Sequence, residues 1–282
     1  MLQIALPNKG SLSEGAVELV REAGYRCKRS GRELMVRDTE NDIEFYFLRP
    51  RDIAVYVGNG LLDLGLTGRD LALDGDAQVA ELMGLGFGKS AFRYAVPKEK
   101  DWLPDTFDGL RVATSYPKLV ETDMAQRGQK VGIVKLDGAV EISIQLGVAD
   151  VIADVVQTGK TLEEAGLKIV GEPVLQSEAI VVARDVDFAQ DPDVHIFLDR
   201  LRGITVAREY VMIEYDAPEA LLEQASALTP GIEAPTVAPL RKPGWVAVKA
   251  MAPRAGINAV MDRLLVLGAK GIIVTDIRTC RL

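Results

Sequence analysis

The segment from Asp154 to Thr161 combines residue types that could hold a phosphorylated sugar. The carboxylate of Asp154 can accept hydrogen bonds from two neighbouring sugar hydroxyls. The residues that follow offer successive backbone N–H groups, two threonine hydroxyls, and Gly159, which lets a ligand approach the backbone closely. An acid followed by a phosphate-binding loop is the arrangement that a ribose 5-phosphate requires. A helix N-cap is the alternative role for Asp154.

The end of this segment also resembles a nucleotide-binding P-loop. Gly159-Lys160-Thr161 matches the last three residues of that motif, which also requires a glycine at position 154. The chain has Asp154 there instead, so the tight glycine turn is lost and a carboxylate stands where the phosphates would bind. The sequence therefore argues against a P-loop kinase or ATPase.

Three other loops with polar side chains follow apolar runs that we interpret as buried strands. Lys9 follows residues 2–6, Tyr116 follows residues 110–114, and Arg69 with Asp70 follows the run that ends at Leu66. Ligands of α/β folds bind outside the carboxyl ends of the strands, so these loops and the Asp154 segment are expected to face one cleft. For Lys9 and Arg69 the alternative is a surface ion pair, and for Tyr116 it is ordinary packing.

An approximate internal repeat supports two α/β lobes around that cleft. Residues 2–6 and 110–114 each lead through a loop with a Pro and a Lys into a helix. Residues 60–66 parallel residues 147–153, each indicating a helix end, a tight turn and a buried strand. Coincidence is the alternative, because βαβ units look alike in any α/β protein.

Local signals place the helices of the repeat. Ser11 and Glu14 form a predicted capping box for the first helix, which Gly24 ends; the second has Pro117 near its start and Gly128 at its end. Residues 140–146 alternate strictly, which favours a strand, whereas the repeat and the following glycine favour a helix end. We predict a helix there.

The C-terminal part follows a different pattern. Residues 190–208 indicate one helix, and the order that follows predicts a ferredoxin-like βαββαβ module, with strands at 210–215, 234–240, 245–251 and 271–277 and helices at 217–227 and 255–267. Pro243-Gly244 predicts a hairpin turn and Gly268 a helix end. The fold of this module does not by itself indicate what it binds.

Composition excludes several classes of protein. Among 282 residues, 33 Lys and Arg against 41 Asp and Glu give a net charge of −8, which argues against non-specific nucleic-acid binding. The apolar runs are shorter than a membrane span and no basic-then-apolar leader is present, so we expect a cytoplasmic protein. Two cysteines (Cys27 and Cys280) and one histidine (His195) argue against a disulfide framework, a zinc site and a Ser-His-Asp triad.

The segment around Asp154 resembles the signature of the ATP phosphoribosyltransferases. The matching residues are Glu141, Gly147-Val148-Ala149, Ile152-Ala153-Asp154-Val155 and Thr158-Gly159-Lys160-Thr161-Leu162, and further agreement lies at residues 7–12, 47–53, 63–70 and 113–117. The resemblance implies two periplasmic-binding-protein-like α/β lobes that form a catalytic cleft, plus a C-terminal ferredoxin-like regulatory domain, as in the family's long form. We expect these domains at residues 1–90 with 185–209, 91–184 and 210–282.

By this resemblance the chain joins ATP to phosphoribosyl pyrophosphate in the first step of histidine biosynthesis. The implied catalytic residues are Lys9, Arg49 and Asp154; for Arg49, as for Lys9, a surface ion pair is the alternative role. The implied phosphoribosyl pyrophosphate contacts are Glu141, Asp154, Val155, Val156, Gln157, Thr158, Gly159, Lys160 and Thr161. The implied ATP contacts are Lys9, Gly10, Ser11, Arg49, Gly68, Arg69, Asp70, Leu71 and Tyr116. Mg²⁺ is expected to arrive chelated by the substrate pyrophosphate, and no metal ligands are assigned to the protein.

The resemblance also implies regulation by L-histidine at the third domain. The implied contacts are Asp216, Ile232, Thr236 and Gly271. AMP is an expected inhibitor, and assembly from dimer to hexamer is expected. Two alternatives remain open from the residues alone: a bilobal small-molecule binding protein without catalysis, and a purely regulatory amino-acid-binding protein.

Overall fold

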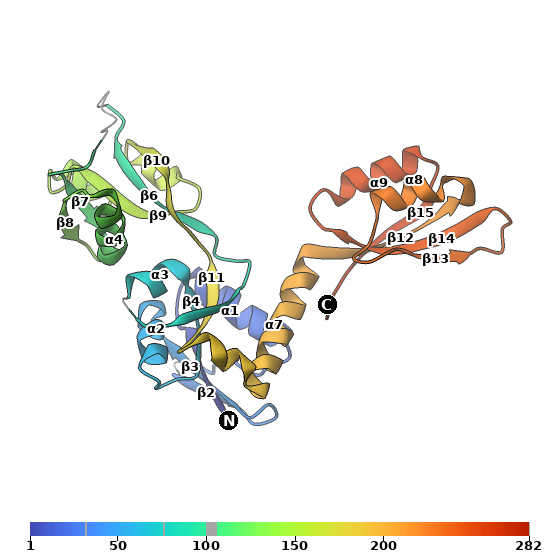
Figure 1. Ribbon diagram of the computed structural model, residues 1–282, viewed down its shortest axis with the longest axis horizontal. Coiled ribbons are helices and arrows are strands. Elements are labelled where there is room, and N and C mark those ends of the chain that lie inside the picture. Colours follow the sequence, from blue (N-terminus) through green and yellow to red (C-terminus); the bar gives the residue numbers. More distant parts are fainter. Residues whose placement is uncertain (32, 76, 100–105, 282) are drawn as a thin grey trace. The chain divides into compact units, whose positions relative to one another are not determined.

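The computed structural model describes residues 1–31, 33–75, 77–99 and 106–281 (Figure 1). The chain divides into two compact units, Met1–Leu198 and Asp199–Leu282, each considered separately below. Within the described residues, none of the helices is both long and apolar enough to cross a membrane.

The first sheet of the N-terminal unit defines the first lobe. Strands β1, β3 and β4 run parallel, and β11 is inserted antiparallel between β4 and β5. The sheet order is β2 (Met35–Asp38), β3 (Ile43–Leu48), β1 (Leu2–Pro7), β4 (Leu64–Gly68), β11 (Ala179–Ala183) and β5 (Ala80–Gly84). The predicted strand at residues 2–6 is therefore confirmed. Buried apolar runs form its central strands because helices cover the sheet.

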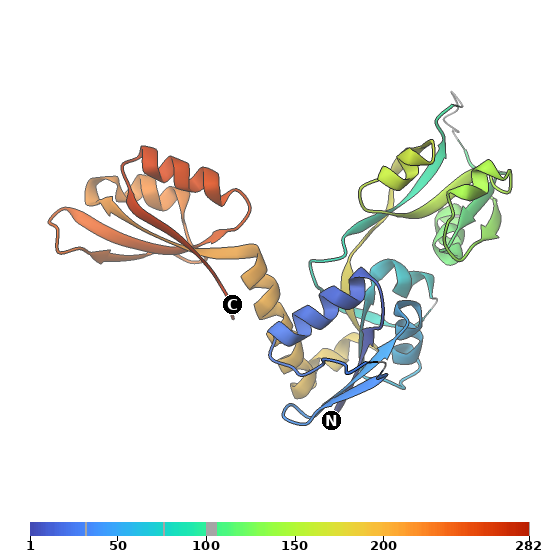
Figure 2. The same ribbon diagram turned by 180° about the vertical axis from the view of Figure 1, so that it is seen from behind.

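Three helices follow the parallel strands of this lobe: α1 (Ser11–Glu22) after β1, α2 (Pro50–Gly58) after β3, and α3 (Arg69–Asp74) after β4. The side chains of Ile53 and Val57 on α2 pack against Ile180 and Val182 of β11. Figure 2 shows α1 from the side opposite to Figure 1.

The predicted capping box at the start of α1 is wrong. Gly10 is the N-cap, with φ 76°, and no side chain caps the helix. Ser11 is already helical, and the carbonyl of Gly10 accepts the N–H of Ser13 at 2.9 Å and that of Glu14 at 3.4 Å. A positive φ at the N-cap favours glycine, and it turns the chain out of β1 without a serine cap.

The second sheet defines the second lobe. Its order is β10 (Leu167–Ser177), β6 (Ser90–Pro97), β9 (Val151–Val156), β7 (Arg111–Thr114) and β8 (Gly132–Lys135), with β7, β8 and β9 parallel. Its helices are α4 (Pro117–Arg127), α5 (Ile142–Gln145) and α6 (Lys160–Glu164). The helix predicted within 140–146 is confirmed as α5, and Gly128 ends α4 in the left-handed conformation.

Asp154 lies in a strand rather than in the loop where we expected it. The parallel pairing of β9 with β7 ends at Ala153, but β6 continues beside β9, and Arg93 pairs with Asp154. The antiparallel partner therefore extends the strand to Val156, and the loop begins at Gln157.

The chain crosses between the lobes twice, from β5 to β6 and from β10 to β11. This topology gives the two α/β lobes expected of a periplasmic-binding-protein-like fold. One boundary differs from expectation, because residues 179–183 fell within the predicted second lobe (91–184) but form β11 of the first sheet. A buried apolar run suits a central strand of either sheet, so its pattern alone does not assign it.

The second unit has the ferredoxin-like order that the sequence predicts. Its antiparallel sheet has the order β13 (Thr236–Pro239), β14 (Trp245–Pro253), β12 (Tyr210–Pro218) and β15 (Lys270–Asp276). Helices α8 (Leu222–Leu228) and α9 (Ile257–Val266), with the short 3₁₀ turn η2 (Glu219–Leu221), lie on one face of the sheet (Figures 1 and 2). The core between these layers includes Ile213, Tyr215, Val248 and Leu264.

Helix α7 (Pro192–Glu209) follows the 3₁₀ turn η1 (Val186–Gln190) and confirms the helix predicted at 190–208. The division between the two compact units falls inside α7, after Leu198. The sequence placed this boundary at the end of the helix, after residue 209. His195 is an exposed residue of α7.

Candidate functional site

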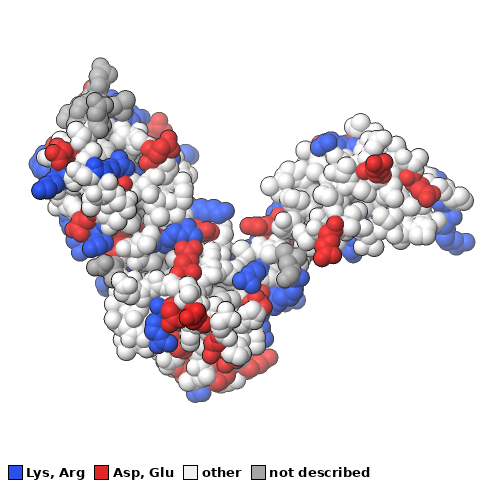
Figure 3. All heavy atoms as spheres, viewed as in Figure 1, with Lys and Arg blue, Asp and Glu red and all other residues white. Residues whose placement is uncertain are grey.

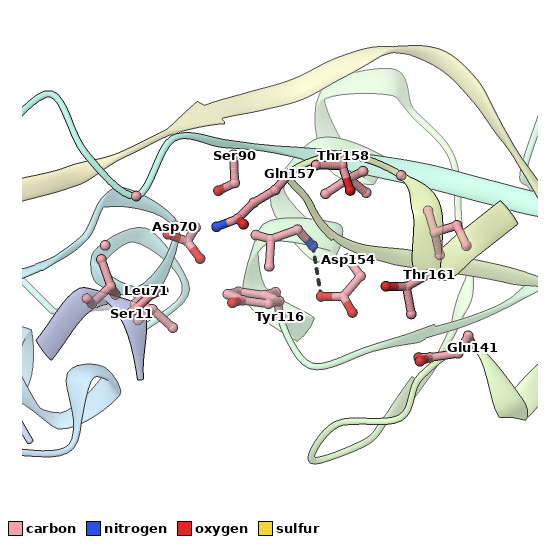
Figure 4. A pocket seen from close by; sticks show the side chains of 17 residues that line it. Ser11, Asp70, Leu71, Ser90, Tyr116, Glu141, Asp154, Gln157, Thr158 and Thr161 are labelled. Atoms are coloured by element: carbon pink, nitrogen blue, oxygen red, sulfur yellow. Dashed lines mark hydrogen bonds between the residues drawn. The ribbon is translucent and has the colours of Figure 1, made fainter. Parts of the chain in front are cut away.

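A pocket of about 430 Å³ lies where the two lobes of the N-terminal unit meet. The first lobe contributes Ser11, Leu12, Gly68, Asp70 and Leu71. Gly88, in the connection to β6, and Ser90, the first residue of β6, also line the pocket. The second lobe contributes Tyr116, Glu141, Asp154–Thr158, Gly159, Thr161 and Leu162. Figure 4 shows Asp154 and Thr161 across from Asp70 and Ser11, with Tyr116 between them. Most of the predicted substrate contacts are thus brought together.

The carboxylate of Asp154 is positioned by its own strand. One oxygen, Oδ1, accepts the backbone N–H of Val155 at 2.8 Å (Figure 4). Burial raises the pKa of Asp154 to about 6; the Val155 bond opposes this shift, and the nearby charges of Glu141 and Asp70 add to it. The buried position therefore destabilises the ionised carboxylate, and hydroxyl donors from a ligand would stabilise it.

Tyr116 and Asp70 link the two walls of the pocket. Burial, together with the nearby charge of Asp70, raises the pKa of the Tyr116 phenol, so it stays protonated. Ser177 holds Asp70 from behind, because its hydroxyl donates to Asp70 Oδ1 at 2.5 Å and accepts the Asp70 N–H at 3.0 Å. The ring of Tyr116 packs edge-on against Phe92, with centroids 5.6 Å apart. One wall of the pocket is therefore the Tyr116 ring, which Phe92 fixes in place.

The loop after β9 leads into α6. Gly159 is the N-cap of α6 with φ 77°, a left-handed conformation that a residue with a Cβ adopts only with strain. Thr158 and Thr161 line the pocket on either side of it, whereas Lys160 does not line the pocket. The predicted phosphate-binding loop thus presents its backbone and threonines to the pocket and turns its lysine elsewhere.

Besides Lys160 and Arg69, three predicted contacts lie outside the pocket lining: Lys9, Gly10 and Arg49. They nevertheless lie at the same edge of the first sheet as Gly68, since β1, β3 and β4 are parallel and end there. The Asn8 N–H donates to the Leu48 carbonyl at 2.8 Å, which joins the loop of Lys9 to the residue before Arg49. Both cationic side chains are exposed beside this edge.

Arg69 does not line the pocket, and its predicted contact with ATP stays a prediction. Its guanidinium donates to Glu81 at 2.7 and 2.8 Å and to Glu178 at 3.3 Å, and these carboxylates raise its pKa. It also donates to the Gln176 carbonyl at 3.1 Å, at the crossing between the lobes. The alternative considered from the sequence, an ion pair, is the role that the structure gives it.

Several lining residues were not predicted from the sequence: Leu12, Gly88, Ser90 and Leu162. Gly88 and Ser90 lie on or next to the first crossing between the lobes, and no local motif marks that segment. Ser177, which holds Asp70, is 107 positions away from it in the chain. Only the pairing of the lobes brings such residues to the site, so a local signal could not identify them.

The pocket is acidic rather than basic. Asp70, Glu141 and Asp154 line it, and the residues that the structure places in its wall include neither Lys nor Arg. On the face shown in Figure 3, the described basic side chains are interspersed with acidic ones. No group of three or more His, Cys, Asp or Glu side chains suited to a metal ion occurs in the described part of the chain. An anionic substrate therefore needs its own counterion in this pocket.

The predicted histidine contacts lie in the second unit but fall into two places. Asp216 of β12 pairs with Lys270, and a Cβ on the neighbouring Gly271 would lie 3.9 Å from Asp216 Oδ2. Thr236 is on β13, opposite Lys249 of β14, and the exposed Ile232 precedes β13. The structure therefore brings Asp216 and Gly271 together and leaves Thr236 and Ile232 across β14.

Comparison with known proteins agrees with this architecture. The family model described as ATP phosphoribosyltransferase matches residues 49–203, and the model described as "HisG, C-terminal domain" matches residues 207–279. An ATP phosphoribosyltransferase of Salinibacter ruber is 59% identical over 100% of both chains. One from Nocardia farcinica is 54% identical over 100% of this chain and 99% of its own.

A solved structure is similar in fold to part of the chain. The "ATP phosphoribosyl transferase (HisG:HisZ) complex from Thermotoga maritima" aligns with a TM-score of 0.63 and 26% identity over 72% of this chain and 97% of that one. The family model covers more than half of the chain, and the two named relatives align along its whole length. The chain belongs to the ATP phosphoribosyltransferase family, in the form that carries the additional C-terminal domain.

Proposed function

We propose that the pocket between the two lobes is the catalytic site of this family's reaction. In that reaction, the phosphoribosyl group of phosphoribosyl pyrophosphate moves to N1 of ATP and pyrophosphate is released, in the first step of L-histidine biosynthesis. The observation that carries the proposal is the meeting of Asp154, the loop through Thr161 and the Tyr116 ring in one pocket.

Each wall of the pocket suits one part of the substrates. Asp154 would accept hydrogen bonds from the ribose hydroxyls, and Val155 to Thr161 would surround the 5-phosphate with backbone N–H groups and two threonine hydroxyls. Glu141 is proposed as a further contact with this substrate. On the opposite wall, the Tyr116 ring would stack on adenine, with Asp70 and Leu71 beside it.

The reaction requires that the two substrates be positioned for attack, and it does not require a strong base. The lone pair of adenine N1 forms the new bond to ribose C1, and the electron pair of the C1–O bond leaves with pyrophosphate. Holding the two reactants in line supplies much of the rate acceleration. No proton has to leave N1 before it attacks, which suits a pocket whose described lining offers carboxylates and a protonated phenol but no histidine.

Mg²⁺ fits this site as a companion of the substrate. Asp70, Glu141 and Asp154 would repel an uncompensated pyrophosphate, so substrate is expected to enter with its metal ion. When bound, the ion neutralises the developing charge on the leaving group. We propose that the exposed side chains of Lys9 and Arg49, at the edge of the first sheet, contribute the remaining positive charge.

Replacing Asp154 tests the proposal. Asp154→Asn keeps the shape of the side chain and removes its charge, so kcat/KM for phosphoribosyl pyrophosphate should fall about tenfold or more, equivalent to roughly 1.4 kcal/mol. The assay follows the ultraviolet absorbance of the N1-substituted adenine with pyrophosphatase present. Asp150→Asn is the matched control, because Asp150 immediately precedes β9, pairs with Arg111 and does not line the pocket. Unchanged kinetics in Asp154→Asn would exclude this pocket as the site.

We also propose that L-histidine inhibits the enzyme by binding at the C-terminal unit beside Asp216 and Gly271. The carboxylate of Asp216 would pair with the amino acid's ammonium group, and Gly271 leaves room beside it. Inhibition at a distance requires that histidine favour one conformational state over another. Thr236 and Ile232 stay in the proposal as further contacts.

The proposed histidine site can be tested by a variant that changes inhibition and leaves catalysis intact. Asp216→Ala should raise the histidine concentration for half inhibition about tenfold or more, the effect of losing a charged hydrogen bond, and leave kcat unchanged. Glu214→Ala is the control, because Glu214 lies on the same strand and pairs with Lys249 at 2.6 Å. Equal loss of inhibition in both variants would point to a general disturbance of the sheet and against a specific contact.

Three further proposals concern inhibition by AMP, assembly of the chains and location in the cell. Inhibition by AMP, which shares the adenosine monophosphate part of ATP, is proposed at the Tyr116 wall. Assembly of identical chains from dimers to hexamers and a cytoplasmic location are proposed from the family. Sedimentation with and without histidine tests the assembly, and competition of AMP against ATP tests the shared wall.

A further inference from the structure

Helix α3 of the first lobe caps helix α4 of the second lobe. Asp74, the last residue of α3, has a side chain only 2% exposed. Its Oδ1 accepts the backbone N–H of Lys118 at 2.9 Å and that of Leu119 at 3.3 Å. These N–H groups belong to the first turn of α4, where helices leave donors without partners inside the helix.

α4 has no cap of its own. Its N-cap residue, Tyr116, makes no side-chain capping bond, and Pro117 at the first helical position has no N–H. A carboxylate at a helix N-terminus both satisfies the free donors and interacts favourably with the helix dipole. Asp74 supplies both functions from the other lobe.

Arg51 of α2 ties the same carboxylate to the loop that carries Tyr116. Its Nη1 pairs with Asp74 Oδ2, and its Nη2 donates to the Ser115 carbonyl at 2.8 Å. Its guanidinium carbon lies 5.0 Å from the centre of the Tyr116 ring. One guanidinium thus contacts a carboxylate of the first lobe, and a carbonyl and a ring of the second.

We propose that Asp74 and Arg51 form an inter-lobe clamp that positions Tyr116 for phosphoribosyl transfer. Neither residue lines the pocket, so they are positioning residues that act through the Ser115–Tyr116 loop. The inference rests on the proposed function, in which this pocket is the catalytic site. Because Asp70 of the first lobe and Tyr116 of the second lobe line the same pocket, the clamp and the pocket wall set the spacing of the lobes together.

The test is the kinetic behaviour of Asp74→Ala and Arg51→Gln in the full-length chain. Each should raise KM for ATP about tenfold, with a smaller change in KM for phosphoribosyl pyrophosphate, because Tyr116 forms the adenine wall. The double variant should be no worse than the poorer single variant, since both remove one coupled unit. Asp74→Asn keeps a capping oxygen and should recover part of the loss.

Asp123→Ala is the matched control. Asp123 lies on α4, the helix that Asp74 caps, and its exposure as a whole residue, 9%, is close to the 8% of Asp74. It instead accepts the Tyr94 hydroxyl at 2.7 Å and pairs with Arg127, both within the second lobe. Its loss should lower the melting temperature and leave KM for ATP unchanged. A rise in KM for ATP in Asp123→Ala equal to that in Asp74→Ala would overturn the clamp.

A distance measurement reads the clamp directly. Spin labels at Glu14→Cys on α1 and Gln126→Cys on α4 report the spacing of the lobes in a Cys280→Ser background, where the remaining Cys27 is buried. Asp74→Ala should broaden the distance distribution, and Asp123→Ala should not. If Asp154→Asn impairs catalysis while both clamp variants keep normal KM values and distances, the clamp is wrong and the catalytic pocket stands. If Asp154→Asn is itself normal, the proposed function has failed.

Discussion

Two aspartates selected from the sequence, Asp154 and Asp216, stand in different surroundings. Asp154 lines a pocket with walls from two lobes, where burial raises its pKa to about 6. Asp216 lies on a strand of an open antiparallel sheet, with Gly271 as its nearest site neighbour. The pocket around Asp154 surrounds a ligand on several sides, whereas the sheet around Asp216 offers one carboxylate and the space beside Gly271. Substitutions at the pocket should therefore change turnover by large factors, and those at the sheet should change inhibition by smaller ones.

Arg49 should show the largest effect of any exposed residue. In Arg49→Ala, kcat/KM should fall about a hundredfold, roughly 2.7 kcal/mol, because the described pocket lining lacks Lys and Arg and the leaving pyrophosphate needs positive charge. Arg69→Ala is the control. Since its guanidinium is already held by Glu81 and Glu178, the kcat/KM of this variant should stay within a few fold of wild type. If Arg49→Ala and Arg69→Ala lowered kcat/KM equally, the proposal that Arg49 at the sheet edge supplies the positive charge would be wrong.

The contrast between these arginines shows what the sequence could and could not predict. Strands, loop positions and the meeting of Asp154 with Tyr116 were predictable, because buried runs and glycine or proline turns are local signals. The direction of an arginine side chain is set by distant partners. Glu178 holds Arg69 from 109 positions away, and Ser115 holds Arg51 from 64 positions away.

The C-terminal module was predictable in fold for the same local reason. Its two central strands, β12 and β14, bury alternate residues against the helices. Its predicted ligand contacts came from the family resemblance and not from the pattern. They fall on β12, on β13 with the preceding loop, and on β15, and only sheet order decides which of them are neighbours.

The pH dependence of catalysis should report Asp154. Because its pKa in the free enzyme is about 6, protonation below that value removes the carboxylate that accepts the ribose hydroxyls. We expect kcat/KM for phosphoribosyl pyrophosphate to fall about tenfold per pH unit below 6, since this parameter reports the free enzyme. The substrate phosphate also titrates near pH 6, so Asp154→Asn is measured alongside. In the variant, kcat/KM should fall at acidic pH only as far as protonation of the substrate phosphate accounts for.

The same raised pKa predicts a stability effect of Asp154→Asn. A carboxyl group whose pKa is raised by folding stabilises the folded state below its unfolded pKa, and this contribution is lost as pH rises through about 6. Without ligand, Asn should therefore raise the melting temperature relative to wild type at pH 7.5. The difference should shrink at pH 4, where Asp154 is largely protonated. Calorimetry at the two pH values checks this, and a variant less stable than wild type at pH 7.5 would contradict the unfavourable burial of the charge.

The smallest effect is expected at the open sheet. Gly271 has φ 60°, so Gly271→Ala forces a left-handed alanine, costing about 1 kcal/mol, and places a methyl group 3.9 Å from Asp216 Oδ2. Gly244→Ala is the control, because Gly244, in the turn before β14, has φ 71° and open space around its missing Cβ. Both variants should lose a similar few degrees of melting temperature, since both introduce the same strain. Only Gly271→Ala should also weaken inhibition by histidine, about threefold to fivefold, because only there does the methyl group narrow the space beside a charge that binds the ligand. Equal inhibition in the two variants would separate Gly271 from the histidine site and leave Asp216 to be tested alone.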